Sequence, residues 1–305
     1  MALAISLTGC GYVGDPLPPA LHIPQTVKDL TVRQVGSSIV VNFTIPSLTT
    51  EGIAMDRVRS VDLRIGDSTG SADEWAAAAQ PASPSETAPG PAQVRIPLRG
   101  WENKAVRVGV RVQSARSRWS EWSPLVALQA VDEVAAPRAV RAESHPRGVR
   151  ITWENATSVR IWRKEEEAAV AKGNEWVDEQ AGFGQAYEYS LESVADSGAV
   201  SERTAPVRFT PEDRFAPSVP TGLTAIAGIG SIELAWERSP EPDLTGYRLY
   251  RSDGGSWSRI SELSPSPSFS DRSVKTGMSY RYCVTSVDGK GNESARSGEV
   301  EALAP

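Results

Sequence analysis

The side chains that most often carry out catalysis are scarce in this chain of 305 residues. It has two histidines, His22 and His145, and two cysteines, Cys10 and Cys283. The histidines stand in separate segments, which argues against a histidine-based metal site or a catalytic triad. No serine-nucleophile motif, zinc-protease motif, phosphate-cradling glycine loop or cysteine–histidine pair is found in the sequence. The sequence therefore predicts a protein that is not an enzyme and that uses no cofactor.

Carboxylates occur in two patterns that are compatible with acid–base chemistry or metal binding. Glu165, Glu166 and Glu167 are consecutive in a charged segment. General acid–base catalysis needs a pocket that shifts a pKa, and no motif here builds one, so we interpret this run as a solvated loop. The second pattern comprises Asp243, Asp271, Asp288 and Asn292. Their spacing is not that of an EF-hand-like loop, so we expect them to bond turns and predict no metal site.

Length and charge limit the class of protein further. A chain of 305 residues predicts two or three domains. The net charge of −6 and the isoelectric point near 5.2 argue against a nucleic-acid partner, which favours a basic face. The sequence has no apolar run of about 18 residues, so we predict no transmembrane helix.

Apolar residues recur at every second position near the C-terminus. Ile232, Leu234 and Trp236 alternate with more polar neighbours, and Tyr280 and Tyr282 belong to a second such run. A period of two indicates a strand with one buried face. Short strands separated by Gly-, Asp- and Pro-containing turns favour a β-sandwich or barrel over alternating strands and helices.

This stretch, within residues 216–305, resembles a fibronectin type III domain. The resemblance rests on the run W-E-R-S-P-E-P-D-L-T-G-Y-R-L-Y-R-S from Trp236, and on S-Y-R-Y-C-V-T-S-V-D-G-K-G-N-E-S up to Ser294. It implies a seven-stranded β-sandwich with Trp236 in the core. It also implies that Tyr280 forms the tyrosine corner, in which the hydroxyl group bonds back to the backbone.

Two weaker copies of the pattern precede this domain. Residues 24–132 carry Phe43 at the place of Trp236, and residues 135–211 carry Trp153 there and Tyr187 as the corner candidate. The predicted fold class is therefore all-β. We expect three tandem fibronectin type III, immunoglobulin-like β-sandwiches that follow a flexible tether at the N-terminus.

The first copy contains an insert near residues 67–93 that is rich in Ala, Ser, Pro and Gly. Long irregular inserts in compact domains are usually functional or disordered. We expect a surface excursion that is disordered, with a helical turn near residues 74–79.

The segment Arg118-Trp119-Ser120-Glu121-Trp122-Ser123 resembles the W-S-x-W-S motif of cytokine-receptor fibronectin domains. In that family the Trp rings stack with Arg side chains of the neighbouring strand. The resemblance implies a ladder of Trp119 and Trp122 with Arg107 and Arg111, which alternation places on one face of the adjacent strand. We interpret the ladder as structural packing.

The N-terminal residues 1–23 provide an expectation about location. Leu7-Thr8-Gly9-Cys10 resembles the lipobox of bacterial lipoproteins, which implies cleavage before Cys10 and a lipid on its thiol. The pattern departs from a full signal peptide because no Lys or Arg precedes Cys10. A Pro- and Gly-containing tether follows. Gly11 is not the Asp that retains some lipoproteins in the inner membrane, so the bacterial cell envelope, and its outer membrane, is favoured.

Two functions follow from these expectations. In the first, a lipid-anchored envelope protein uses its sandwiches as binding or spacer modules for protein partners. In the second, it is a glycan-binding adhesin whose outward rings Trp162, Tyr250 and Trp257 form a platform. Alternation places Cys283 on the outward face of its strand as a partly covered thiol.

Overall fold

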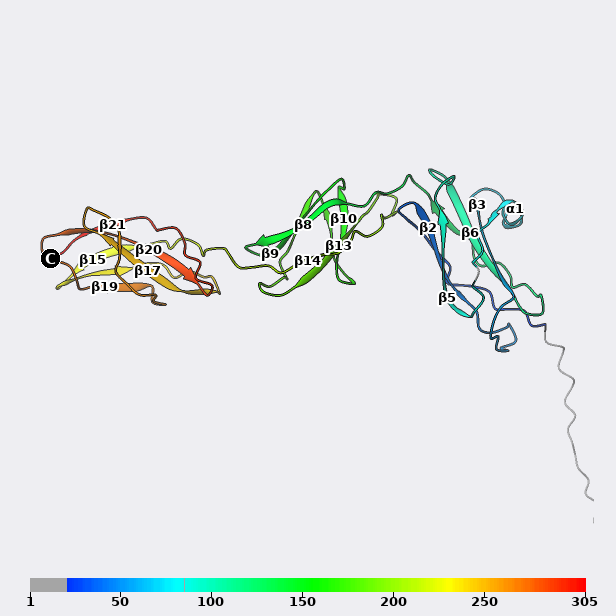
Figure 1. Ribbon diagram of the computed structural model, residues 1–305, viewed down its shortest axis with the longest axis horizontal. Helices are drawn as coiled ribbons and strands as arrows, with labels where there is room; N and C mark the ends of the chain where they lie inside the picture. Colours follow the sequence, from blue (N-terminus) through cyan, green and yellow to red (C-terminus); the bar gives the residue numbers. More distant parts are fainter. Residues whose placement is uncertain (1–20, 85) are drawn as a thin grey trace, which may run out of the picture. The chain divides into compact units, whose positions relative to one another are not determined.

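The computed structural model describes residues 21–84 and 86–305 (Figure 1). In this part of the chain one helix, α1 (Ala72–Ala78), accompanies strands that form antiparallel sheets. The prediction of an all-β fold is therefore confirmed. Cys10 and the rest of the predicted lipobox lie outside the described residues.

The strands fall into three blocks along the chain. The first block contains β1 (Thr31–Val35), β2 (Ser38–Ile45), β3 (Ser60–Asp67), β4 (Gln80–Pro81), β5 (Gly90–Pro97), β6 (Ala105–Gln113) and β7 (Val126–Gln129). The second contains β8 (Arg138–His145), β9 (Gly148–Glu154), β10 (Ser158–Arg163), β11 (Glu166–Lys172), β12 (Glu175–Asp178), β13 (Tyr187–Ser193) and β14 (Val207–Phe209). The third contains β15 (Thr224–Gly228), β16 (Ser231–Ala235), β17 (Leu244–Ser252), β18 (Ser258–Arg259), β19 (Ser268–Asp271), β20 (Ser279–Asp288) and β21 (Val300–Leu303).

Each block repeats one arrangement of strands. A three-stranded sheet has the orders β1-β2-β5, β8-β9-β12 and β15-β16-β19 in the successive blocks. A four-stranded sheet has the orders β4-β3-β6-β7, β11-β10-β13-β14 and β18-β17-β20-β21. The third and sixth strands of a block therefore always lie side by side at the centre of the larger sheet.

The first block shows how the period of two builds a core. Val61, Leu63 and Ile65 of β3 pair with Val112, Val110 and Val108 of β6. All six side chains are buried in the cluster that Phe43 and Ile45 of β2 also enter. Figure 1 shows β2 and β5 in one layer of this block and β3 and β6 in the other. Successive strand residues point to opposite faces, so the residues between them face outward.

The predicted aromatic residues occupy equivalent positions. Phe43, Trp153 and Trp236 are all buried. The hydroxyl oxygen of Tyr187 accepts a hydrogen bond from the Gly182 N–H at 2.8 Å, five residues earlier. The hydroxyl of Tyr280 accepts one from the Lys275 N–H at 3.1 Å, again five residues earlier.

The prediction of disorder for the insert is wrong for its described residues 67–84 and 86–93, whereas the helical turn predicted near residues 74–79 is present as α1. Helix α1 begins with a capping box in which Ser71 and Glu74 bond each other's backbone N–H groups. β4 then pairs with β3, and the insert ends within β5, which pairs with β2. The physical reason lies in Trp75, an apolar residue whose burial holds α1 on the sheet.

Contacts between Cα atoms group the described chain into two compact units, and the strands of the second block are divided between them. The first unit holds residues 21–138, 154–173 and 190–205, and the second holds the remainder. None of the helices in the described part of the chain is long and apolar enough to span a membrane.

Candidate functional site

A pair of hydroxyl residues braces the sixth strand of every block. In the first block, Ser120 and Ser123 accept hydrogen bonds from the Val112 and Val110 N–H groups at 3.0 and 3.1 Å. Their own N–H groups donate to the carbonyls of the same two valines. The same bonds recur in the later blocks, where the hydroxyl residues are Ser201, Thr204, Ser294 and Ser297. Residues spaced as S-x-x-S/T therefore extend the hydrogen bonding along the backbone of the sixth strand, with their hydroxyl groups as additional acceptors.

In the first block the brace carries an arginine–tryptophan stack. The guanidinium carbon of Arg111 lies 4.6 Å from the ring centroid of Trp119 and 4.5 Å from that of Trp122. Asp62 accepts hydrogen bonds from Arg111 and from Arg64, whose guanidinium carbon lies 5.6 Å from the Trp122 centroid. Asp62 therefore fixes both cations against the same indole.

Arg107, the other arginine predicted for the ladder, does not stack on these rings. Its Nη2 donates to the carbonyls of Thr69 and Gly70 at 2.6 and 2.9 Å. The reason is the docking of α1, because the Trp75 ring covers Gly109, which lies between Arg107 and Arg111 on the outer face. Trp75 also meets Trp122 edge to face at 5.5 Å.

In the other two blocks the arginine, and not the aromatic ring, belongs to the S-x-x-S/T segment. Arg203, between Ser201 and Thr204, lies 3.6 Å from the Trp162 centroid. Arg296, between Ser294 and Ser297, lies 4.9 Å from the centroid of Tyr250 and 5.4 Å from that of Trp257. The motif thus supplies the cation, and the strands beside it supply the ring. The repeated S-x-x-S/T spacing marks these stacks in the sequence, but the stacks of the second and third blocks were not predicted from it.

This arrangement changes the interpretation of the outward rings. Trp162, Tyr250 and Trp257 are only partly exposed, and each has an arginine over its ring. A guanidinium group in this position occupies a face that a sugar ring would need. The expected open platform of three rings is therefore not formed.

We predict that Arg111→Lys lowers the free energy of unfolding of the first block by about 1–2 kcal/mol, because an ammonium group cannot stack on two rings and bond Asp62 with a planar fork. Chemical denaturation followed by tryptophan fluorescence, with hydrogen exchange of β6 as the local readout, measures the change. Arg33→Lys on the exposed side of β1 is the control and should shift stability by less than about 0.5 kcal/mol. Equal losses in both variants would contradict the stack's role.

Cys283 lies on the outward side of β20, yet it is fully buried rather than partly covered. Tyr250 pairs with it across the strands, and Arg296 stacks on Tyr250. Burial raises the pKa of its thiol to about 11. The thiolate that would react is therefore disfavoured at neutral pH.

Three carboxylates form the group that could hold a cation. Oxygen atoms of Asp213, Asp243 and Asp288 all lie within 4.8 Å of one another. Burial raises the pKa of Asp288, but hydrogen bonds from Asn292 and from nearby backbone N–H groups outweigh it and lower that pKa below its usual value. Asp288 accepts three of these bonds from Lys290 and Asn292, so it closes a turn as the sequence led us to expect.

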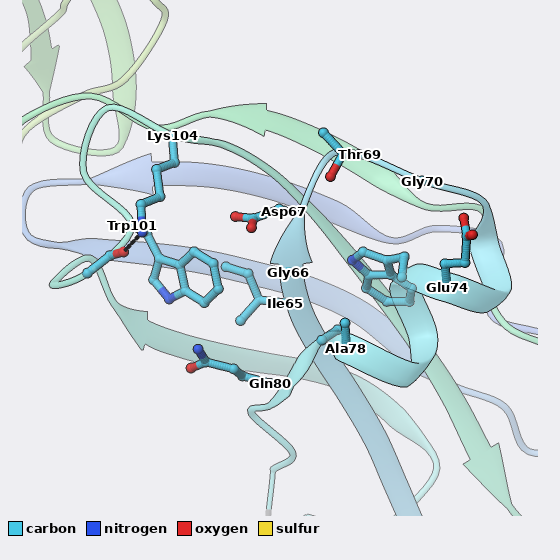
Figure 2. Close-up of a pocket in the computed structure, with 13 residues that line it drawn as sticks. Ile65, Gly66, Asp67, Thr69, Gly70, Glu74, Ala78, Gln80, Trp101 and Lys104 are labelled. Carbon is cyan, nitrogen blue, oxygen red and sulfur yellow. Dashed lines mark hydrogen bonds between the residues drawn. The ribbon is translucent and has the colours of Figure 1, made fainter.

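A pocket of about 470 Å³ lies between α1 and the turn at Gly100–Lys104 (Figure 2). Ile65 and Gly66 of β3 lie between the Trp101 indole and the helix, and the Asp67 carboxylate points into the same space. Lys104 donates to the Gly100 carbonyl at 2.8 Å, and its Nζ lies 5.7 Å from the Trp101 centroid. No sequence motif indicated this pocket, because its two walls are distant in the chain.

The repeated strand order decides the fold family. Every block pairs a three-stranded sheet with a four-stranded sheet in one order, and two blocks have a tyrosine corner. These are features of the seven-stranded immunoglobulin-like sandwich. The chain carries tandem fibronectin type III domains. The first, second and third blocks are its first, second and third domains.

The chain is similar to proteins of known structure. No protein-family model matches the chain. It is similar to an Fn3-like protein from Clostridium thermocellum, with 32% identity over 30% of this chain and 96% of that one, at a TM-score of 0.27. The FN1–FN3 domains of chicken CNTN1 match 92% of this chain and 99% of theirs with 12% identity, at a TM-score of 0.31.

Curated relatives match a part of the chain the size of one domain. An amylopullulanase of Thermoanaerobacterium saccharolyticum is 38% identical over 88 residues, or 28% of this chain. An amylopullulanase of Thermoanaerobacter thermohydrosulfuricus is 39% identical over 95 residues, or 30% of this chain. The fibronectin type III chain spans only 7% and 6% of the length of these two relatives.

Proposed function

We propose that this protein is a non-enzymatic, lipid-anchored protein of the bacterial cell envelope. Its fibronectin type III domains, at residues 24–132, 135–211 and 216–305, act as a binding or spacer scaffold for protein partners. A lipid on Cys10 attaches it to a membrane, with the outer membrane favoured. Domains of this type commonly serve as spacers or binding modules, and the fold alone does not specify which.

One observation supports protein binding above all: the exposed apolar side chains on two edge strands of the third domain. β15 and β21 are the edges of their sheets and contact each other. Ile226 on β15 is 69% exposed and Leu303 on β21 is 61% exposed. Exposed apolar side chains beside unpaired backbone groups favour pairing with another chain.

The equivalent first strands of the other domains are protected. β1 carries Arg33, and β8 carries Arg138 and Arg141, whereas β15 has the sequence T-A-I-A-G without a charge or a proline. Charged residues on an edge strand discourage pairing with another chain. The third domain is therefore the one whose edge is suited to a partner.

Site-specific photo-crosslinking in cells tests this proposal. A photoreactive residue at position 226 should give a discrete crosslinked product, and Leu303→Glu should reduce that product at least about tenfold by placing a charge in the contact. The control position is Val170 on β11, which is 54% exposed in the second domain. Absence of a product at position 226, or an equal product at position 170, would refute the edge contact.

Cell fractionation tests the lipid anchor separately. Cys10→Ala should release the protein from the membrane fraction, because the acyl chains supply the affinity for the bilayer. Val170→Glu is a control that should leave the distribution unchanged. Retention of the Cys10→Ala variant in the membrane fraction would show that the anchor is wrong.

Glycan binding is the second candidate. Relatives of this chain are named as amylopullulanases and an alpha-amylase, of which it spans at most 7%. The observation in its favour is the pocket beside Trp101, where an aromatic ring adjoins the polar side chains of Asp67, Thr69 and Gln80.

A further inference from the structure

The pocket between α1 and the Gly100–Lys104 turn has the volume of a small-molecule site. Its volume of about 470 Å³ falls within the range of about 300–1,000 Å³ that such sites have. Trp101 packs one part of its surface on the domain core and lines the pocket with another. Figure 2 shows the indole on one side of the space and the helix with Glu74 and Ala78 on the other.

Three polar side chains in this pocket have no hydrogen-bond or ion-pair partner among the described residues. Within the described part of the chain, no hydrogen bond or ion pair involves the Asp67 carboxylate, the Thr69 hydroxyl or the Gln80 amide. Figure 2 shows Asp67 and Gln80 directed toward the space beside Trp101. In contrast, Asp62, the other carboxylate on a strand of this domain, forms ion pairs with two arginines. The pocket therefore keeps polar groups available to a ligand.

A buried donor adjoins the same space. The Trp75 indole N–H has no acceptor in the described structure, although its side chain is buried. A Cβ atom placed on Gly66 would lie 3.0 Å from the Ala79 Cβ and 3.1 Å from this nitrogen, so a glycine here lets α1 pack closely on β3. A buried donor without an acceptor is costly, so an acceptor atom of a ligand that reached this nitrogen would stabilise the pocket wall.

The lining selects among ligand classes. Asp67 and Glu74 oppose an anion, while Lys104 already occupies the position of a cation near the Trp101 ring. Donors and acceptors both remain: the Lys104 ammonium, the Trp75 N–H and the Gln80 amide beside the Asp67 carboxylate. An indole beside mixed donors and acceptors suits a molecule with an apolar part and several hydroxyl groups.

We propose that this pocket binds a neutral saccharide of one or two sugar units, which contacts the part of Trp101 that lines the pocket and places hydroxyl groups on Asp67 and Gln80. The helix α1 creates the site, since its docking through Trp75 closes the second wall. This site does not depend on the edge strands of the third domain, and either proposal can fail without the other.

The test measures binding of defined sugars to the full chain. The probes are maltose, cellobiose, N,N′-diacetylchitobiose, glucose, glucosamine and glucuronate, followed by saturation-transfer NMR and isothermal titration calorimetry. At least one neutral sugar should bind, and Trp101→Ala should weaken its binding at least about tenfold. Gln80→Ala, at an exposed position that carries no risk to folding, should weaken it about three- to tenfold.

A matched control removes an indole from another stack. Trp257→Ala in the third domain should leave sugar binding unchanged, and hydrogen exchange of β3 and β6 should show that the Trp101→Ala variant keeps the first domain folded. Three results would overturn the proposal: no binding of any neutral sugar, an affinity unaffected by Trp101→Ala and Gln80→Ala, or tighter binding of glucosamine or glucuronate than of every neutral sugar.

Discussion

Replacing Gly148 by alanine is expected to unfold much of the second domain. Gly148 begins β9 with a φ of +137°, and a Cβ atom there would lie 2.1 Å from the carbonyl oxygen of Asp178. The obstacle is backbone, which cannot rotate away as a side chain can. Backbone strain and overpacking of this kind each cost about 1–3 kcal/mol, so we expect a loss of at least about 3 kcal/mol.

A matched glycine separates the clash from the strain. Gly184 in the same domain also has a positive φ, of +79°, but a Cβ atom there would meet nothing within 4 Å. Gly184→Ala should therefore cost only about 1–2 kcal/mol. Hydrogen exchange of β9 and β12, together with thermal unfolding of the whole chain, measures both variants. If the two alanine variants exchanged at the same rate, the close contact at Gly148 would not be what limits that position.

The second large effect is expected at Asp271 of the third domain. Its carboxylate is buried and accepts hydrogen bonds from Arg251 at 2.8 Å, from the Tyr282 hydroxyl at 3.0 Å and from Ser273 at 2.7 Å. Asp271→Ala leaves the buried Tyr282 hydroxyl and the Arg251 guanidinium without this acceptor. We expect a loss of roughly 3 kcal/mol in the free energy of unfolding of this domain.

The same residue predicts an acid dependence. Burial raises the pKa of Asp271, but the hydrogen bonds from Ser273, Arg251 and Tyr282 outweigh it and hold the pKa below the usual value of 3.8. A carboxyl group whose pKa is lowered by folding stabilises the folded state above its unfolded pKa. That contribution should be lost as the pH falls from about 4 through the lower folded pKa.

Denaturant unfolding between about pH 2 and pH 7, with hydrogen exchange of β19 and β20 as the local readout, measures both effects. The wild-type chain should lose stability in this domain more steeply below about pH 4 than the Asp271→Ala variant does. Glu299→Ala is the control, because its ion pair with Arg281 is exposed and should contribute less than about 1 kcal/mol. An acid dependence that is unchanged in the Asp271→Ala variant would assign the effect to another group.

The family resemblance allowed local features to be predicted from residue types. Trp236 and Tyr280 were assigned to the core and the corner of the sandwich, and both are buried, the latter with its hydroxyl on the Lys275 N–H. These assignments depend on positions within one strand and on a turn five residues away. Such relations are local in sequence: the period of two indicates which face of the strand is buried, and the resemblance implies the roles of the two aromatic residues.

The candidate site could not be predicted in this way. Arg64, rather than Arg107, joins Arg111 beside Trp122. The reason is that the Trp75 ring lies over Gly109, between Arg107 and Arg111 on β6. Composition suggested disorder for the insert that contains Trp75, but a single buried indole and a capping box give that segment a fixed place. Composition averages over residues and does not register one such contact.

The sequence alone determined that this protein is a series of all-β sandwiches, because the alternation of apolar and polar residues fixes which face of each strand is buried. The tertiary structure decided which outward residues meet. It buried the Cys283 thiol in the stacked face of the third domain and placed α1 opposite Trp101 to form a pocket. The physical reason is that strand pairing and helix docking bring together residues far apart in the chain, and their distances follow from packing, not from spacing along the sequence.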